Sequence, residues 1–475
     1  MTDKITLFWF RQDLRISDNP GLFEAAKRGP VMPIYILEED ILNSFKRGSA
    51  SKWWLNQSLA MLNKALNNNL NLYKGNPKDL LLEIIQKNYI EAVFWNTCFT
   101  PWHLKKDDEI IACLEGKGIK SYCFNASLLW DPSKILKKEG SFYKVFTPFY
   151  QQGCLRSLSP RYPLPTPEKL ILIKDNVNPT TLSDLNLLTS KKWYQSLALH
   201  WKVGEKAAQN KLESFLDQGL QGYKEGRNYP AQFHTSRLSP YLHFGEISPN
   251  QVWHAIQSKN LYPGLEKDVE SFLRELGWRE FSSYLLYHFP TLPDENFQSK
   301  FNDFPWEENK SLLKAWQKGQ TGYPLVDAGM RELWQTGYMH NRVRMVVASF
   351  LVKNLLLHWR YGADWFWDCL IDADLANNSA SWQWVAGSGA DASPYFRIFN
   401  PVLQGKKFDP KGEYTCQYVP ELKSLPKKYL FNPWDAPAEI LKSAGVVLGQ
   451  NYPYPIVDLK QSRLRALKAF KMISK

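Results

Sequence analysis

The stretch from Asp372 to Asp409, DADLANNSASWQWVAGSGADASPYFRIFNPVLQGKKFD, gathers carboxylates, amides, two tryptophans and a basic end. A helix that begins near Asp374 would place Asn378, Ser381 and Trp382 on one face, because residues three and four apart are neighbours on a helix. An amide and an indole would then face the same object. A single buried tryptophan is ordinary in a core, but the complete segment indicates a binding site.

Length and composition indicate how many domains the chain has and what kind of partner it binds. The chain has 475 residues, more than one core usually supports, so we expect two domains. Its 44% hydrophobic and 14% aromatic residues exclude disorder and favour sites where rings stack on flat ligands. The 59 Lys and Arg exceed the 47 Asp and Glu, and the net charge of +12 favours an anionic partner, nucleic acid first.

Several kinds of chemistry lack their sequence signatures. No C-x-x-C, H-x-x-H or H-E-x-x-H pair occurs, so we expect neither a metal site nor a disulfide framework. There is no G-x-S-x-G elbow of a serine hydrolase either. The N-terminus lacks a secretory signal, and the apolar stretch 345–359, interpreted as a core helix, is too short to span a bilayer. We expect a cytoplasmic protein with no membrane partner.

The first part of the chain alternates between strand and helix patterns. Apolar runs predict strands at 5–10, 31–37, 70–74 and 91–96, and helical patterns lie at 52–66, 77–87 and 104–114. This alternation predicts an α/β domain over residues 1–131, with a Rossmann-like parallel sheet covered by helices on both faces. Neither G-x-G-x-x-G nor a Walker A sequence follows the first strand, so this sheet gives no sign of the usual phosphate site.

A proline-rich linker separates this domain from a second, all-α domain. The linker covers 132–202, and its aromatic segment FYKVFTPFY, 142–150, is expected to pack against a domain. From 203 to 475 the patterns are helical without strand alternation.

TSRLSP, 235–240, places hydroxyls and an arginine immediately before a helix, with Ser239 as N-cap and Pro240 as the first helical residue. Such a helix start can bind a pyrophosphate. Tyr223 and Arg227, just upstream, add a ring and a cation. A capped helix with a solvent-facing arginine would give the same pattern, so this segment is weak evidence by itself.

Two further helices carry polar groups at regular spacing. In ELGWREF, Glu275, Trp278 and Arg279 share one stripe with Ser282, opposite an apolar stripe. In MHNRVRM, Asn341, Arg342 and Met345 face one space, whereas Arg344 points elsewhere and would need an aspartate of the D-A-D sequence at 372–374. Hydroxyls, stacking rings, one candidate acid and a basic rim suit a bound aromatic cofactor that acts on a nucleic acid.

These motifs resemble those of the DNA photolyase/cryptochrome family, most closely the microbial class I cyclobutane pyrimidine dimer photolyases. The resemblance runs from FWFRQDLRISDN, 8–19, to GKKFDP, 405–410. It implies that the helical domain binds FAD and that the α/β domain of some members binds an antenna chromophore. The implied activity is light-driven: the excited reduced flavin passes an electron to a dimer in UV-damaged DNA, the ring bonds split, and the electron returns. The enzyme would be a deoxyribodipyrimidine photo-lyase.

The resemblance also implies roles for particular residues. The implied FAD contacts are Tyr223, Thr235, Ser236, Arg237, Leu238, Ser239, Arg344 paired with an aspartate, Asp372, Ala373, Asp374 and Asn378, which would face flavin N5. The implied relay that passes electrons to oxidised flavin is Trp306, Trp359 and Trp382. The implied dimer-binding and catalytic residues are Glu275, Trp278, Asn341, Arg342, Met345 and Trp384, together with Asn378. The implied DNA contacts are Arg227, Arg279, Arg397 and Gln404, beside Glu275, Trp278, Asn341 and Arg342.

Some alternatives stay open. The segment NTCFTPWHLKK, 96–106, matches neither main antenna pattern, so a second chromophore, folate or deazaflavin, is left unassigned. A cryptochrome that signals without repair is the main alternative, although the sequence stops at Lys475 without the long tail of many signalling cryptochromes. Repair of the (6-4) photoproduct would need a histidine pair, whereas His340 is followed by Asn341 and Met345. We expect a monomer.

Overall fold

The computed structural model describes residues 5–38, 46–175, 180–190 and 192–473. The chain forms two compact units, which we call the sheet unit, Met1–Gln221 with Ser236–Pro290, and the helical unit, Gly222–Thr235 with Thr291–Lys475. These units follow contact density, whereas the sequence borders at 131 and 203 follow composition, and those borders stay predictions.

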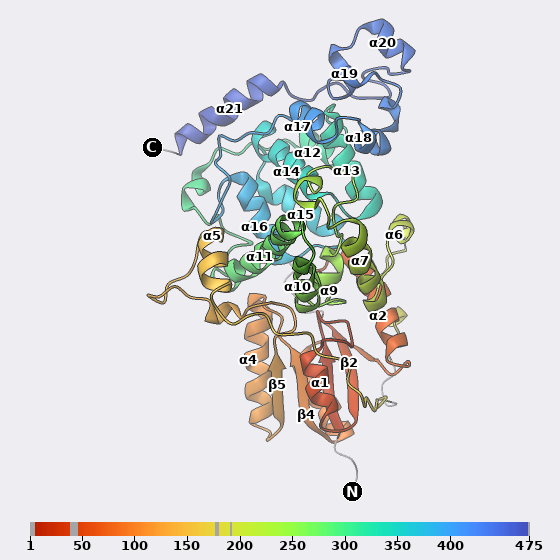
Figure 1. Ribbon diagram of the computed structural model, residues 1–475, viewed down its shortest axis with the longest axis vertical. Coiled ribbons are helices and arrows are strands. Elements are labelled where there is room, and N and C mark those ends of the chain that lie inside the picture. The colour runs from red at the N-terminus through yellow and green to blue at the C-terminus, as the bar shows by residue number, and fades with distance from the viewer. Residues whose placement is uncertain (1–4, 39–45, 176–179, 191, 474–475) are drawn as a thin grey trace. The chain divides into compact units, whose positions relative to one another are not determined.

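The sheet unit contains a five-stranded parallel sheet (Figure 1). Its strands are β1 Ile5–Phe10, β2 Val31–Leu37, β3 Asn71–Lys74, β4 Ile90–Asn96 and β5 Lys120–Phe124, in the order β3-β2-β1-β4-β5. All four neighbouring pairs are parallel, which confirms the predicted α/β fold. The edge strand β5 was not predicted, because its sequence KSYCF is polar and only partly buried and therefore lacks an apolar run.

Helices alternate with these strands and cover them. They are α1 Pro20–Ala26, α2 Ser49–Ala65, α3 Pro77–Asn88 and α4 Pro101–Glu115. Asn19 and Asn76 cap α1 and α3, each followed by proline in the first turn, so side chains accept the otherwise unpaired amides. Trp9, Ile34 and Trp95 belong to the buried core beneath. This core fixes the ends of β1 and β4.

The other helices of the sheet unit follow the last strand in the chain. They are α5 Phe146–Pro148, a π-helix η3 Phe149–Cys154, α6 Gln195–His200, α7 Glu205–Gln218, α9 Ser239–Phe244, α10 Pro249–Gln257 and α11 Glu266–His288. Phe146 and Phe149 of the predicted aromatic segment pack against Phe281 of α11, which confirms that this segment is held against a domain.

The described part of the helical unit contains α-helices and short 3-10 or π segments. Its helices are α8 Tyr223–Gly226, α12 Lys310–Gln317, α13 Pro324–Thr336, α14 Asn341–Ser349, the π-helix η7 Phe350–Asn354, α15 Trp359–Cys369, α16 Leu375–Ala386, α17 Pro401–Phe408, α18 Glu413–Tyr418, α19 Lys427–Leu430, α20 Ala438–Ser443 and α21 Leu459–Met472. No described helix is long and apolar enough to cross a membrane.

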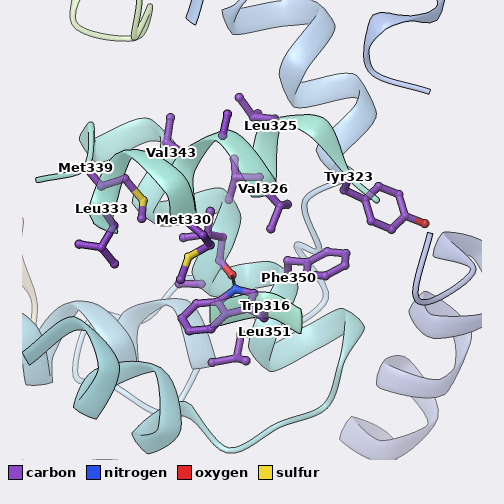
Figure 2. Packing of buried hydrophobic residues seen from close by; sticks show 14 of the residues in the cluster. Trp316, Tyr323, Leu325, Val326, Met330, Leu333, Met339, Val343, Phe350 and Leu351 are labelled. Atoms are coloured by element: carbon purple, nitrogen blue, oxygen red, sulfur yellow. Dashed lines mark hydrogen bonds between the residues drawn. The ribbon is translucent and has the colours of Figure 1, made fainter. Parts of the chain in front are cut away.

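Trp316 lies at the centre of a large buried cluster in the helical unit (Figure 2). Around it are Met330 of α13, Val343 of α14 and Leu351 of η7, and the indole Nε1 of Trp316 donates to the carbonyl of Val347 at 3.0 Å. A satisfied indole can be buried without loss. The cluster therefore holds α13, α14 and η7 as one rigid support.

The predicted core helix 345–359 is wrong in its second half. α14 passes into η7, the chain then leaves helical geometry, Leu356 has a left-handed φ of 55°, and α15 starts only at Trp359. The cause is tertiary: the carbonyl of Leu356 accepts from the amide of Glu307 at 2.9 Å. These backbone groups bond across the fold instead of continuing the helix.

Candidate functional site

Helix α16 contains the first part of the segment 372–409, in which the sequence most strongly predicts a binding site. Asp374 is its N-cap and accepts from the amide of Asn377 at 2.9 Å, which confirms the predicted start. Asn378 donates its amide Nδ2 to the carbonyl of Ala363 in α15 at 3.1 Å, and Trp382 is buried, whereas Ser381 is exposed and does not share their environment. Helix α15 is thus the object that the amide and the indole face.

An ion pair between the partly buried Arg344 and the buried Asp372 joins the start of α14 to the D-A-D sequence. Arg344 donates through Nη2 to both carboxylate oxygens of Asp372, at 2.8 and 3.1 Å, and through Nε to the carbonyl of Met339 at 2.7 Å. Burial by itself would lower the pKa of Arg344, but the carboxylate of Asp372 keeps the guanidinium pKa above its usual value. Asp372 is therefore the partner, while Asp374 caps α16.

The three tryptophans of the predicted relay come together in the helical unit. Trp382 and Trp359 are buried, and Trp306 is partly buried. A Cβ at Gly362 would lie 2.0 Å from Cη2 of Trp382, so the outer edge of this indole packs closely against α15, one turn from Trp359. The indole Nε1 of Trp359 donates to Oδ1 of Asn296 at 3.0 Å. Indoles that run from a buried position toward the surface can carry single electrons.

A second cluster in the helical unit surrounds Arg342. Its guanidinium donates to Oδ1 of Asn228, lies 4.5 Å from the ring centroid of Phe408, and approaches Sδ of Met345 at 3.9 Å. Burial, followed by the charge of Arg227, lowers the pKa of Arg342. Within the described ranges no carboxylate forms an ion pair with Arg342. Arg342, which has no counterion among the described residues and is repelled by Arg227, favours an anionic ligand.

Other predicted residues of the helical unit are spread over its surface and core. Arg397 and Asn341 are exposed, and Trp384 is partly buried. Oε1 of Gln404 is buried and accepts no hydrogen bond from any described residue. Tyr223 and Ala373 are buried, and Thr235 is partly buried. Residues of the described chain include no group of three or more His, Cys, Asp or Glu that could hold a metal ion.

In the sheet unit, α11 presents Glu275, Trp278 and Arg279, all partly buried. The ring of Trp278 stacks on Phe146 with centroids 3.8 Å apart and planes within 9°, so one face of the indole is covered. Ser282, predicted on the polar stripe, is instead buried and donates to the carbonyl of Trp278 at 3.1 Å. A serine bonded one turn back satisfies its hydroxyl within the helix.

A buried carboxyl beside this stripe was not recognised from the sequence. Glu280 accepts from Arg279 Nη1 at 2.9 Å and from the amide of Leu129 at 2.8 Å. Burial raises the pKa of Glu280 to about 7, although Arg279 opposes this. Arg279 therefore has a neighbouring acidic partner. The sequence pattern E-x-x-x-R-E does not indicate that its second glutamate, Glu280, is buried.

The predicted cap at Ser239 is wrong. Helix α9 starts at Ser239, its N-cap is Leu238 in helical conformation, and no side chain makes a capping bond. Arg237 has a left-handed φ of 52°, and its guanidinium lies 4.8 Å from the ring centroid of Trp201. Because this turn begins with helical geometry at Leu238, Ser239 already lies inside the helix. Left-handed conformation at a non-glycine residue is often found where a ligand is bound.

A third group lies at the carboxyl ends of β1 and β4, where the strand order reverses. Arg11 Nη1 donates to both oxygens of Asp107 at 2.8 Å and the guanidinium lies 4.5 Å from the ring of Trp9. Nε and Nη2 of Arg11 and Nε1 of Trp9 are buried and bond to no described residue. Ligands of open parallel sheets bind at such a reversal. The strand order, rather than any motif, points to this position as a candidate ligand site.

The helical unit thus holds three tryptophans at the predicted relay positions and an arginine, Arg342, that pairs with no described carboxylate. Comparison with known proteins identifies the family. Residues 6–168 match the family model of DNA photolyase, and residues 272–472 match that of the FAD binding domain of DNA photolyase. The chain belongs to the DNA photolyase/cryptochrome family.

Individual relatives show the extent of the similarity. A deoxyribodipyrimidine photo-lyase of Agrobacterium fabrum is 45% identical over 99% of this chain and 98% of its own length. Cryptochrome-2 of Arabidopsis thaliana is 40% identical over 98% of this chain and 79% of its own length. The crystal structure of a bacterial class III photolyase from Agrobacterium tumefaciens superposes with a TM-score of 0.95 at 44% identity, over 100% of this chain and 98% of the other.

The residues of the FAD-binding domain fit a flavin. Asn378 is oriented by its bond to Ala363, and its Oδ1 accepts none of the hydrogen bonds found among the described residues. The partly buried Arg344 is paired with the buried Asp372 of the D-A-D sequence. An amide and an ion pair held this firmly can orient the edge of a polar ring system.

Proposed function

We propose that the protein is a deoxyribodipyrimidine photo-lyase, which repairs cyclobutane pyrimidine dimers in DNA by electron transfer from photoexcited reduced FAD. The observation that carries the proposal is the Arg342 cluster. The guanidinium of Arg342, the ring of Phe408 and the thioether of Met345 suit a phosphate next to a base, and Arg342 pairs with no described carboxylate. A photoreceptor that does not bind DNA has no need of a partly buried arginine without a carboxylate partner.

Bound FAD would supply light absorption and the transferable electron. In the helical unit, Asn378, Asp374 and the Arg344–Asp372 pair hold the flavin edge, and Tyr223 contributes a buried ring. The backbone at 235–239, where the chain leaves the helical unit at Thr235, receives the phosphates, with the left-handed Arg237 setting its path. These assignments keep the roles expected from the sequence but replace the Ser239 cap with backbone geometry.

Other residues would recognise the flipped-out dimer. The uncovered face of Trp278 stacks on a base, because Phe146 already supports its other face. Glu275, one turn away on α11, is placed to hydrogen-bond the polar edge of the dimer. Asn341, Met345 and Trp384 contribute an amide, a thioether and an indole. Arg227, Arg279, Arg342, Arg397 and Gln404 bind the DNA backbone.

Within the family we propose a place in class III. The motifs alone predicted the microbial class I enzymes. The match at TM-score 0.95 and 44% identity to a structure described as a class III photolyase favours class III instead.

A second chromophore, folate or deazaflavin, would be bound at the ends of β1 and β4. The buried nitrogens of Arg11 and Trp9 that lack described partners offer donors for such a ligand. We also propose that the protein acts as a monomer in the cytoplasm.

The alternative is a cryptochrome photoreceptor without repair activity. The 40% identity to Cryptochrome-2 of Arabidopsis thaliana supports it. One experiment decides: a defined oligonucleotide with one thymine dimer is mixed with protein whose flavin is fully reduced, in light and in darkness. Repair in light alone supports the lyase. Absence of repair and of any preference for damaged DNA, in protein that retains FAD, rejects it in favour of the photoreceptor.

A further inference from the structure

His358 lies in the helical unit, directly before Trp359, and none of the assigned roles includes it. It is the N-cap of α15, where its Nδ1 accepts from the amide of Arg360 at 3.1 Å. Because Nδ1 is an acceptor, the neutral ring carries its proton on Nε2. The position and tautomer of this imidazole are therefore fixed by the start of the helix.

The His358 ring is in contact with two indoles of the relay. Its centroid is 5.2 Å from that of Trp306, with the rings edge-to-face, and 5.5 Å from that of Trp359, with planes within 29°. On its other side, Trp306 contacts Phe304 at 4.4 Å. The imidazole thus provides a continuous path of ring contacts between the two tryptophans.

His358 is uncharged at neutral pH. Burial, followed by the nearby charge of Arg360, lowers its pKa to about 4. The charge of Arg360 also reaches Trp359, whose ring lies 5.6 Å from the guanidinium carbon. A neutral ring matters here, since an imidazolium between two indoles would repel the positive charge that passes from one to the other.

We propose that His358 is the bridge of the relay, so that the electron passing from Trp306 to Trp359 travels through its imidazole. This inference rests on the proposed function, in which light drives oxidised flavin to withdraw an electron from Trp382 and Trp359 refills that position. In the step through His358, Trp306 loses one electron and oxidised Trp359 regains one. No bond forms or breaks at His358 and no proton moves. A soluble thiol afterwards gives one electron to the Trp306 radical and restores the neutral indole.

Three variants separate the ring of His358 from its cap. His358→Phe keeps an aromatic ring and loses the capping acceptor, His358→Asn keeps an acceptor suited to an N-cap and loses the ring, and His358→Ala loses both. Each is prepared with oxidised FAD and a thiol. Transient absorption after a light flash measures how fast the Trp306 radical forms, and thermal unfolding measures the effect on the fold.

The two readouts should rank the variants differently. We expect His358→Asn and His358→Ala to slow formation of the Trp306 radical several-fold, with His358→Phe close to wild type. The unfolding midpoint should instead fall for His358→Phe and His358→Ala and stay near wild type for His358→Asn. Radical formation at the wild-type rate in His358→Asn, or a rate that follows the unfolding midpoint, overturns the bridge.

The test of the His358 bridge does not depend on whether the protein repairs DNA. Chemically reduced protein repairs without the relay, so a wild type that forms the Trp306 radical but leaves dimers intact refutes the proposed lyase and leaves the bridge testable by the same variants. A wild type that forms no Trp306 radical overturns the bridge itself, whatever its repair activity.

Discussion

Trp382 is the residue whose replacement best separates photoreduction from repair. It is buried against Gly362 and its ring lies 5.0 Å from that of Phe366. In Trp382→Phe a ring remains, but it is far harder to oxidise. We expect light-driven reduction of oxidised FAD to stop, while chemically reduced protein repairs normally, with a loss of stability on the order of 1–3 kcal/mol from the smaller ring. Absorbance of the flavin under illumination checks this, and normal photoreduction would show that the electron uses another route.

Glu246 gives the fold a pH dependence of known sign. It is fully buried and accepts from Trp54 Nε1 at 3.2 Å and from the amide of Gly204 at 3.0 Å. Burial raises its pKa to about 8 from a usual value of 4.5. The folded chain therefore keeps a proton that the unfolded chain releases. This contribution to stability is complete below pH 4.5 and is lost as the pH rises through 8, by at most about 1.4 kcal/mol per pH unit.

Denaturant unfolding at several pH values between 5 and 9 tests this linkage. Glu246→Gln carries no titrating proton, so the difference in unfolding free energy between wild type and this variant should shift with pH in the variant's favour. A difference that stays constant across the range would show that Glu246 does not titrate in the folded protein.

At the level of elements, the contact between α15 and α16 depends on Gly362. A methyl group there would lie 2.0 Å from the Trp382 ring. Alanine gains about 1 kcal/mol over glycine inside a helix, but overpacking against a rigid indole loses about 1–3 kcal/mol. We expect Gly362→Ala to destabilise the protein and to slow photoreduction by displacing Trp382.

Gly116 offers a matched control for this substitution. It follows α4 with a φ of −61°, and its nearest neighbour to an added Cβ is 3.4 Å away. Gly116→Ala should therefore leave stability unchanged or raise it by about 0.4–1 kcal/mol. If both variants unfold at the same temperature in calorimetry, the helix contact tolerates the methyl group and the argument from Gly362 is wrong.

The π-helix η7 anchors the loop that presents Arg397. Lys353 is buried there and donates to the carbonyl of Arg397 at 2.9 Å, and Ser349, one turn earlier, accepts from the amide of Phe399 at 3.4 Å. Burial, followed by the charge of Arg397, lowers the pKa of Lys353 to about 7. We expect Lys353→Met, which fills the space without the bond, to weaken dark binding of dimer-containing DNA several-fold in a titration.

Arg397→Ala is the comparison for that variant. It removes the charge and should flatten the salt dependence of binding, whereas Lys353→Met should leave the salt dependence unchanged because Arg397 is still present. Equal slopes for the two variants would mean that Arg397 neutralises no phosphate.

The sequence predicts those elements whose cause is local. The strands 5–10 and 31–37 were predicted to the residue, because buried apolar runs between polar turns have few other conformations. The start of α16 follows from Asp374 as its cap. The prediction that one helix continues to residue 359 was wrong, because the carbonyl of Leu356 bonds to the amide of Glu307 in a distant part of the chain. The spacing of apolar residues along the chain cannot predict such a contact.

The contacts of the candidate site likewise fall into those that the sequence predicted and those that come from distant parts of the chain. The partner of Arg344 was narrowed to two aspartates by charge balance alone, and packing chose Asp372. Asn228 and Phe408 beside Arg342, and Asp107 beside Arg11, come from remote segments and could not be derived from spacing. The sequence did not indicate a role for His358, because its ring contact is with Trp306, which is distant in the chain.

For the molecule as a whole, the net charge of +12 makes DNA binding the most telling measurement. Each phosphate neutralised on a duplex releases counterions, so the logarithm of affinity should fall by about 0.9 for each unit in the logarithm of salt concentration. Basic groups of the helical unit, Arg227, Arg342 and Arg397, are expected to add together in this slope. A binding constant measured at one salt concentration would not reveal their number.

Arg342 allows the slope to be assigned to a particular group. Arg342→Ala should reduce the slope by about one and weaken binding to damaged and undamaged DNA alike, because a phosphate contact carries little sequence information. Arg342→Lys keeps the charge but loses the fork held by Asn228, so its slope should match wild type while its affinity falls. Lys78, exposed on α3, is the control, and Lys78→Ala should change neither quantity. An Arg342→Ala slope equal to that of wild type would place the phosphate contacts elsewhere and would remove the observation on which repair was proposed.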